Sequence, residues 1–420
     1  MENQQVNNLI ITFTHSNYLE QASGTEKFIR TLSKRLQSDG YNHLVFFSIK
    51  TKFLYKTVGV IYNDCFVGVF KYDAIQMVID SYCYNNRLSV TEVMIQHLRD
   101  HDIEILKACI YQLKVPVAFF VHDLYSICPS ETMVSSEGRY CEQFRPSEAC
   151  RFCDYADKAI NHYYKMNDFL NSIGKYLVLV ICPSTFLKEK WCNAFPDFLR
   201  IAIVRPHNIL SGFTNYNLSS YPIKIAFCGA QLRNKGFTEW ERFCELVRSD
   251  ARFRLFYLGK GNKEIEGVIN IYVNNASQGE NAMREAIKLN KIDCAFVWPL
   301  CPETYSYVYD ELSLNGVFIL TNKISGNIAV QVSERGNGVV LDQFEDVMRF
   351  IQGDNLITQI NEYRGHGTFH PKNCMENNTT DSLILDKQNQ FYVMQKPIRI
   401  HSDGLMTLAY KIKNSLRKRR

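Results

Sequence analysis

The sequence has no long apolar run. No window of about 18 uncharged apolar residues occurs, so no segment is expected to span a bilayer. The first 15 residues, MENQQVNNLIITFTH, have no basic start and only a short apolar core, unlike a secretory signal peptide. We therefore expect a cytoplasmic protein.

The chain also lacks a strong charge surplus, internal repeats and low-complexity tracts. Its 48 Lys and Arg exceed its 43 Asp and Glu by only five, and six basic residues stand among the last ten. A surplus this small does not indicate a nucleic-acid partner. With 420 residues, 46% of them hydrophobic and 22% charged, the chain has the composition of a globular protein of two or three domains.

Fourteen cysteines in a chain expected to be cytoplasmic predict reduced thiols and no disulfide framework. Cys150 and Cys153 have the spacing Cys-x2-Cys, and Cys128 and Cys141 precede them within 25 residues. Four thiolates are a ligand set that holds structural zinc. These four residues are therefore either a structural zinc site or core thiols, like the cysteines in the apolar runs.

Short apolar runs alternate with amphipathic patterns in the first half of the chain. Residues 26–37, EKFIRTLSKRLQ, place four apolar side chains on one helical face. Strands that are apolar on both faces and separated by such helices are typical of a parallel sheet covered on both sides. The predicted strands are residues 9–13, 43–48, 115–121 and 176–182.

Residues 205–222 interrupt this alternation, because RPHNILSGFTNYNLSSYP is rich in Asn, Ser, Gly and Pro. A second alternation follows, so we expect an α/β protein of two doubly wound, Rossmann-like domains with a ligand cleft between them, at the carboxyl ends of their strands. The predicted parts are an N-terminal domain (1–204), a linker (205–222), a C-terminal domain (223–360) and an irregular tail with a basic terminal helix (361–420). The second set of strands is predicted at 223–228, 254–258, 269–273, 292–297, 317–321 and 338–341.

Residues 298–321, WPLCPETYSYVYDELSLNGVFILT, join a buried strand to a helix through a polar turn. Glu303 lies in the turn, and Glu311 lies inside a helix that is predicted to begin near Tyr305. The free N–H groups of Tyr305 and Ser306 at the positive end of this helix suit a phosphate. Two turns deeper, the Glu311 carboxylate suits the hydroxyls of a vicinal diol such as a ribose. The alternative is an acidic helix start with solvated glutamates.

The segment FCGAQLRNKGF, which follows the linker, carries two cations. Gly229 ends the predicted strand, Arg233 and Lys235 follow, and Gly236 opens a helix. A fixed ammonium in a dry cleft stabilises negative charge that develops on a bound group without a metal. The alternative is a solvated turn with ordinary surface charges.

Two segments of the first half are predicted at the same edge. In ASGTEKF, Gly24 lets the backbone approach a ligand, and Thr25 is predicted to cap a helix that begins at Glu26. In FFVHDLYS, His122 and Asp123 emerge at the carboxyl end of a central strand. The alternative for this pair is structural, with Asp123 satisfying the hydrogen bonding of His122.

These motifs together resemble the donor-site signature of glycosyltransferase family 4. The features that carry the resemblance are Pro-Glu at 302–303, the aromatic-Ser turn, the second Glu after seven intervening residues and the Gly…Lys-Gly element. The resemblance covers roughly residues 5 to 345. It departs from the family at Ala230, where many members carry Arg, and at Gly24, where two glycines are common. The His-Asp pair and the cysteines are similar to a bacterial subgroup that acts in surface-polysaccharide assembly.

The resemblance implies a retaining glycosyltransferase of the GT-B fold that takes a nucleoside-diphosphate sugar and needs no catalytic metal. The acceptor would be a hydroxyl of a glycan or a lipid-linked glycan. Lys235 would bind the donor diphosphate, with Arg233 as second cation, while Glu303 faces the sugar and Glu311 the ribose. The catalytic candidates are His122, Lys235 and Glu303, and the substrate-binding candidates are Gly24, Asp123, Arg233, Tyr305, Ser306 and Glu311.

Other outcomes stay open at this point. The same fold would suit a sugar-nucleotide epimerase, which needs no acceptor, or a non-catalytic scaffold that binds sugar nucleotides. The segment LMTLAYKIKNSL places Leu405, Leu408, Ile412 and Leu416 on one stripe of a final helix, which the basic end KIKNSLRKRR overlaps. This basic end predicts either contact with anionic lipid at the inner face of the cell membrane or a solvated tail.

Overall fold

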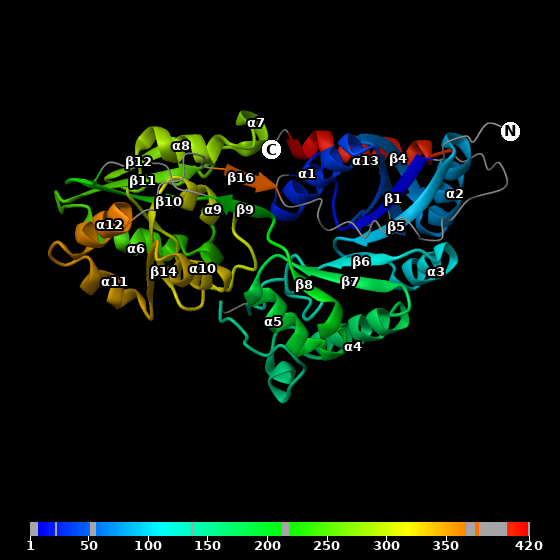
Figure 1. Ribbon diagram of the computed structural model, residues 1–420, viewed down its shortest axis with the longest axis horizontal. Coiled ribbons are helices and arrows are strands. Elements are labelled where there is room, and N and C mark those ends of the chain that lie inside the picture. Colours follow the sequence, from blue (N-terminus) through cyan, green and yellow to red (C-terminus); the bar gives the residue numbers. More distant parts are fainter. Residues whose placement is uncertain are drawn as a thin grey trace.

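A computed structural model describes residues 7–21, 23–50, 56–135, 138–211, 218–366, 374–377 and 401–418 of the chain. Two lobes lie side by side, each built on its own sheet with helices on both faces (Figure 1). We call the lobe of the first sheet the N-lobe and that of the second sheet the C-lobe. None of the helices within the described ranges is both long and apolar enough to cross a membrane.

The N-lobe sheet has eight strands in the order β4-β3-β2-β1-β5-β6-β7-β8. Strands β1, β2 and β5 to β8 run parallel, whereas β3 and β4 form an antiparallel hairpin on β2. The parallel sheet expected from the sequence is thus extended by an antiparallel edge. The strands are β1 (Asn7–Thr14), β2 (Asn42–Ser48), β3 (Thr57–Tyr62), β4 (Cys65–Lys71), β5 (Leu88–Ile95), β6 (Val117–Phe120), β7 (Leu177–Cys182) and β8 (Ala202–Val204).

The C-lobe sheet has six parallel strands in the order β12-β11-β10-β13-β14-β15. This is the strand order of a doubly wound nucleotide-binding sheet. Successive strands are added towards one edge from β10 to β12 and towards the other edge from β13 to β15, so the order reverses between β10 and β13. Each of the six strands overlaps a predicted one. They are β10 (Ile223–Cys228), β11 (Phe253–Gly259), β12 (Val268–Tyr272), β13 (Cys294–Phe296), β14 (Phe318–Asn322) and β15 (Gly338–Leu341).

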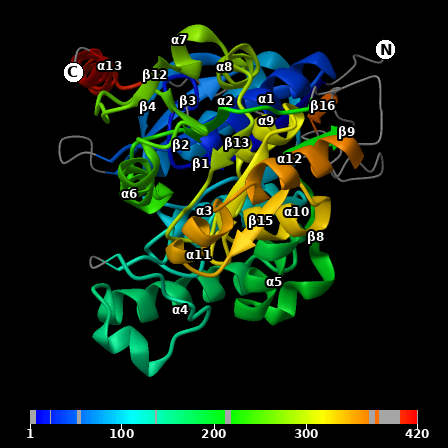
Figure 2. The ribbon, with the colours of Figure 1, turned by 90° about the vertical axis from the view of Figure 1, so that its left-hand side faces the viewer.

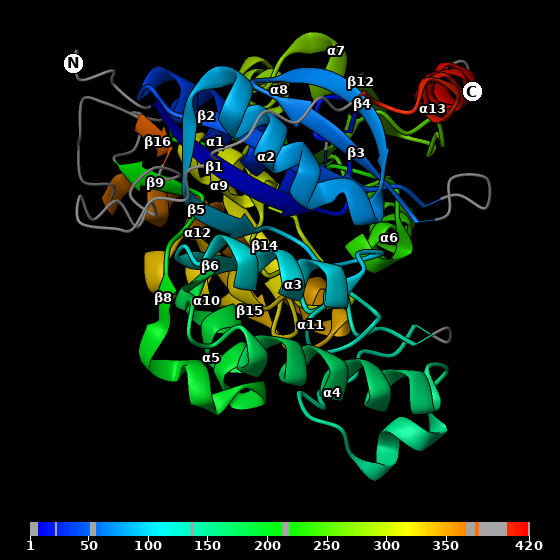
Figure 3. The ribbon, with the colours of Figure 1, turned by 90° about the vertical axis from the view of Figure 1, so that its right-hand side faces the viewer.

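Helices cover both faces of each sheet because each carries one apolar stripe. In the N-lobe, α2 to α5 pack on one face, and α1 and α13 on the other (Figures 2 and 3). In the C-lobe, α6, α11 and α12 pack on one face, and α8, α9 and α10 on the other. The helices are α1 (Gly24–Ser38), α2 (Ile75–Asn86), α3 (Ile103–Leu113), α4 (Ala156–Ser172), α5 (Thr185–Ala194), α6 (Phe237–Val247), α7 (Asn275–Gln278), α8 (Ala282–Asn290), α9 (Tyr307–Leu314), α10 (Asn327–Arg335), α11 (Phe344–Phe350), α12 (Asn355–His366) and α13 (Gly404–Lys418).

The end of the described chain returns to the N-lobe. Strand β16 (Cys374–Asn377) pairs antiparallel with β9 (Asn208–Ser211), and α13 packs beside β4. The predicted boundaries at 204, 222 and 360 stay a prediction. Of the predicted linker and tail, residues 212–217, 367–373, 378–400 and 419–420 lie outside the described residues.

Candidate active site

Lys235 and Glu303 form an ion pair at the carboxyl edge of the C-lobe sheet. Lys235 ends a short 3-10 turn after β10, and Glu303 lies in the loop after β13. The Lys235 Nζ and Glu303 Oε1 atoms are 2.6 Å apart. Burial lowers the pKa of Lys235, but the adjacent Glu303 carboxylate outweighs it, so the net pKa is raised. The predicted cation and the predicted sugar-facing carboxylate therefore lie together, with the lysine charged.

Gly236 fixes the position of this turn. Its φ of +81° is left-handed, and a Cβ atom there would lie 1.9 Å from the carbonyl oxygen of Trp298, in the loop that carries Glu303. Glycine is required here because any side chain would push the loops after β10 and β13 apart.

Gly236→Ala should destabilise the C-lobe by about 3 kcal/mol, because left-handed strain adds to a backbone overlap that must be relieved. The measurement is the midpoint of urea unfolding. Gly353→Ala is the matched control, since Gly353 also has a positive φ, of +62°, but no atom within 4 Å of the added carbon. It should cost about 1 kcal/mol. Equal losses in the two variants would contradict a packing role for Gly236.

Helix α9 begins two residues later than predicted, at Tyr307. Ser306 is its N-cap, and the Ser306 Oγ atom accepts a hydrogen bond from the Tyr309 N–H at 3.2 Å. The first N–H groups of α9 have no carbonyl of the helix to bind, so this end suits an anion. Tyr305 is turned inward, where its hydroxyl donates to Asp310 at 2.5 Å.

Glu311 is buried on α9 and pairs with a residue of the other lobe. Its Oε1 atom lies 3.5 Å from the Nζ atom of Lys27 on α1. The same ammonium lies 4.5 Å from the ring centre of Tyr307. Burial raises the pKa of Glu311 to about 7, although Lys27 opposes this. The predicted ribose-binding carboxylate is therefore covered by a cation from α1.

Arg233 and Gly24 also lie between the lobes. The guanidinium of Arg233 is 3.0 Å from the point where a Cβ atom of Gly138 would stand, so this cation contacts a loop of the N-lobe. The corresponding point at Gly24 is 3.6 Å from the Tyr307 ring, an ordinary contact distance. A Cβ atom at position 24 would therefore fit beside Tyr307, so this contact does not require glycine. The predicted Thr25 cap is wrong, because α1 begins at Gly24 with Ser23 as N-cap.

His122 is buried at the end of β6 and stays neutral, since burial lowers its pKa to about 3. Its Nε2 atom lies 2.6 Å from the Oε1 atom of Gln96, and its Nδ1 atom has no partner among the described residues. Its carbonyl accepts a hydrogen bond from the Thr304 hydroxyl at 2.7 Å, next to Glu303. A neutral imidazole that donates through Nε2 keeps Nδ1 as an acceptor, which suits a sugar hydroxyl.

Asp123 is not the hydrogen-bond partner of His122, so the pairing predicted in the structural alternative is wrong, although each side chain has another structural partner. The Asp123 carboxylate accepts from the Nε2 atom of His97 at 3.0 Å and from the Tyr125 N–H at 2.8 Å. Burial opposes ionisation, but these contacts lower the pKa of Asp123 to about 2. Because the Arg99 N–H donates to His97 Nδ1, the proton of that imidazole lies on Nε2.

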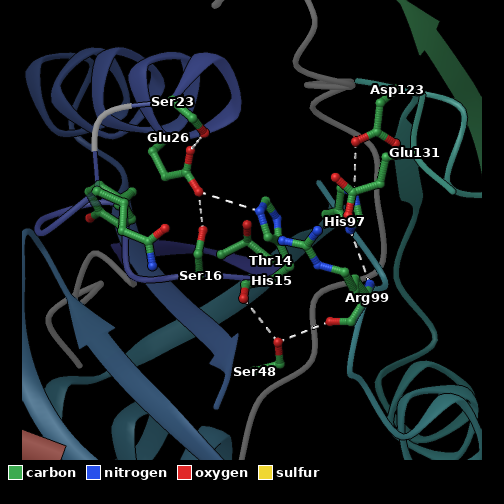
Figure 4. A network of polar contacts seen from close by, with 12 residues as sticks. Thr14, His15, Ser16, Ser23, Glu26, Ser48, His97, Arg99, Asp123 and Glu131 are labelled. Atoms are coloured by element: carbon green, nitrogen blue, oxygen red, sulfur yellow. Dashed lines mark hydrogen bonds and ion pairs between the residues drawn. The ribbon is translucent and has the colours of Figure 1, made fainter. Parts of the chain in front are cut away.

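A wider polar network joins the ends of β1 and β5 (Figure 4). The fully buried Glu26 accepts hydrogen bonds from Ser16 and Ser23, and its carboxylate lies 3.4 Å from the Nε2 atom of His15. The ring centres of His15 and His97 are 4.3 Å apart. This edge of the N-lobe is therefore lined by buried, hydrogen-bonded polar groups.

Sequence reasoning missed residues of the linker that reach α9. The Asn208 side chain donates to Asp310 at 2.8 Å, and its N–H donates to the Tyr305 hydroxyl at 3.0 Å. The ring of His207 lies between those of His122 and Tyr305, with centres 5.5 and 4.3 Å away. The Asn-rich composition of the segment indicated a loop but gave no sign of this contact.

The four predicted zinc ligands converge without forming a metal cluster. Cys128, Cys141, Cys150 and Cys153 all line one hollow beside α4. Burial raises the pKa of Cys128 to about 11, so this thiol is protonated. Within the ranges that the structure describes, no group of three or more His, Cys, Asp or Glu residues is arranged to hold a metal ion. The zinc site is therefore not confirmed.

The arrangement of the lobes is shared with solved glycosyltransferases. A glycosyltransferase of Rickettsia africae matches with a TM-score of 0.52 at 11% identity, over 86% of this chain and 93% of that one. HepE of Anabaena in complex with UDP matches with 0.50 at 10% identity, over 85% and 93%. The pneumococcal O-GlcNAc transferase GtfA in complex with UDP and GlcNAc matches with 0.50 at 7% identity, over 86% and 91%. No protein-family model and no curated protein sequence matches this one. The chain therefore has the GT-B fold.

Proposed function

We propose that this chain is a retaining glycosyltransferase that moves a sugar from a nucleoside diphosphate to a hydroxyl of a glycan or lipid-linked glycan. The observation that carries the proposal is the Lys235–Glu303 ion pair at the carboxyl edge of the C-lobe sheet. A doubly wound sheet binds its ligand at this edge, close to where its strand order reverses. Two of the solved neighbours are complexes with UDP, which supports the same class of donor.

The proposed roles follow from charge and position. Lys235, with Arg233 as second cation, stabilises the charge that grows on the departing diphosphate. The N–H groups at the start of α9 bind a phosphate, and Glu311 accepts hydrogen bonds from the ribose. Glu303 and His122 are assigned to the sugar hydroxyls, from opposite lobes.

The acceptor site is assigned to the N-lobe. Asp123 and the helix start at Gly24 border the polar edge that includes His15 and His97. In the retaining reaction that the resemblance implies, the acceptor hydroxyl attacks the face from which the diphosphate leaves. A leaving phosphate oxygen takes the hydroxyl proton, so neither a nucleophile of the chain nor a catalytic metal is used. The resemblance further points to surface polysaccharides, such as lipopolysaccharide or capsule, as the product.

The test is a panel of nucleoside-diphosphate sugars supplied to the full chain, with release of nucleoside diphosphate measured with and without glycan acceptors. We expect one donor to release its nucleotide, faster when a suitable acceptor is present, with the anomeric configuration kept in the product. Release of nucleotide with an isomerised free sugar in every case would favour an epimerase. Binding without release would favour a scaffold.

A further inference from the structure

Helix α13 is held on the N-lobe by its inner face. The ring of Tyr410 lies 5.7 Å from that of Phe47 and 5.3 Å from that of Phe66. The Thr407 hydroxyl accepts a hydrogen bond from the N–H of Val69 on β4 at 2.9 Å. The Asn17 side chain donates to the Tyr410 hydroxyl at 3.2 Å. This helix therefore packs on the N-lobe beside β4 (Figure 3).

The outer face of α13 is apolar. Leu405, Leu408 and Ile412 are 82%, 55% and 52% exposed. Because residues three, four and seven apart lie on one side of a helix, these three side chains form one stripe. A helix that met only water and its own lobe would carry polar residues on this face. The stripe therefore points to a further apolar contact.

The charge of α13 indicates which kind of partner surface the stripe contacts. Residues 404–418 contain no Asp or Glu, while the exposed Lys411 stands beside the stripe and Arg417 and Lys418 follow in the sequence. The Lys413 ammonium is held by the carbonyl of Lys50 on the N-lobe. A second copy of this helix would bring like charges together, and a nucleic acid would leave the leucines in water. An anionic lipid surface satisfies both features, since acyl chains take the stripe and headgroups take the cations.

We propose that α13 lies in the plane of an anionic membrane surface, with Leu405, Leu408 and Ile412 inserted at the boundary of headgroups and acyl chains. The N-lobe is thereby fixed to the membrane, because α13 packs on its sheet. This inference needs no donor chemistry. Together with the proposed function, it brings the acceptor-binding lobe to the surface where a lipid-linked glycan is found.

The test is co-sedimentation of the full chain with vesicles of phosphatidylcholine, alone or mixed with phosphatidylglycerol. We expect binding to the mixed vesicles that weakens as salt is added. The triple variant Leu405→Ser, Leu408→Ser, Ile412→Ser should partition at least about tenfold less, because three buried apolar side chains are lost. Lys411→Glu should also weaken binding.

The matched control is the triple variant Leu199→Ser, Leu246→Ser, Leu289→Ser. It removes three leucines that are 56%, 55% and 79% exposed elsewhere on the molecule, and it should sediment like the unchanged protein. Equal loss in both triple variants, or equal binding to neutral and anionic vesicles, would overturn the proposal. So would a fall from dimer to monomer in the α13 variant without vesicle binding. Donor turnover with a soluble acceptor should be unchanged in both variants, so failure of either proposal leaves the other testable.

Discussion

Lys235→Ala is expected to lower turnover about 100- to 1,000-fold while leaving the donor dissociation constant within a few-fold. The Lys235 ammonium stands 2.6 Å from Glu303 at the sheet edge, where a diphosphate acquires charge as the sugar bond breaks. An interaction that strengthens in the transition state affects turnover more than ground-state binding, and loss of one such group costs this much. The measurement is the rate of nucleoside diphosphate release at saturating donor.

Two variants isolate the role of the charge. Lys263→Ala removes another lysine of the C-lobe that is paired with a carboxylate, that of Glu241, and it should leave turnover within about twofold. Lys235→Arg keeps a cation and should recover part of the rate. If Lys235→Ala reacted as fast as the unchanged chain, the proposed leaving-group role would be wrong.

Glu311→Ala is expected to raise the donor dissociation constant about 10- to 100-fold with a smaller effect on turnover. A buried carboxylate that accepts hydrogen bonds from two ribose hydroxyls contributes in both the ground state and the transition state. Calorimetry with the preferred nucleotide sugar measures this loss. Glu345→Gln alters an exposed ion pair with Arg242 and should bind the donor normally.

The contact with Lys27 calls for a second variant. Glu311→Ala also removes the ion pair between the lobes, so a loss of affinity has two candidate causes. Lys27→Met breaks the same pair but keeps the carboxylate. We expect it to change donor affinity much less than Glu311→Ala does. Equal losses in the two variants would assign the effect to the contact between the lobes and contradict the ribose role.

Donor affinity should also depend on pH. Burial raises the pKa of Glu311 to about 7 and that of the neighbouring Asp310 to about 6, while Lys27 and Arg284 are the cations that favour the ionised Glu311. The ionised carboxylate is the better acceptor, so affinity increases as pH rises through this range. Between pH 6 and 8 the dissociation constant should fall about tenfold. Glu311→Gln should remove most of this dependence, and an unchanged pH profile in that variant would exclude Glu311 as its source.

The sequence predicts the apolar strands better than it predicts other parts of the fold. Residues 223–228 and 338–341 form strands with the predicted bounds, because uninterrupted apolar runs are typical of buried parallel strands. Strand β5 was missed since Ser89, Thr91 and Glu92 interrupt its apolar pattern, although all three side chains are buried. The β3–β4 hairpin was missed because its turn is Asn63-Asp64, which the linear pattern did not single out.

The partners within the candidate site were harder to predict. The ion pair of Lys235 with Glu303 joins two loops whose proximity follows from adjacent parallel strands. By contrast, Lys27 and Glu311 are 284 residues apart and lie in different lobes. No local sequence pattern predicts such a pair, since the pairing depends on how two complete sheets face each other. The same holds for Asn208 and Asp310.

Four of the polar contacts between the lobes involve residues 304–311. Ser184 and the carbonyl of His122 bind Thr304, Asn208 binds Asp310, and Lys27 binds Glu311. The nucleotide is proposed to bind along the same eight residues. Any displacement of this segment by an arriving donor would therefore disturb all of these attachments together. Donor binding is therefore expected to alter the contacts that join the two lobes as well as those within the C-lobe.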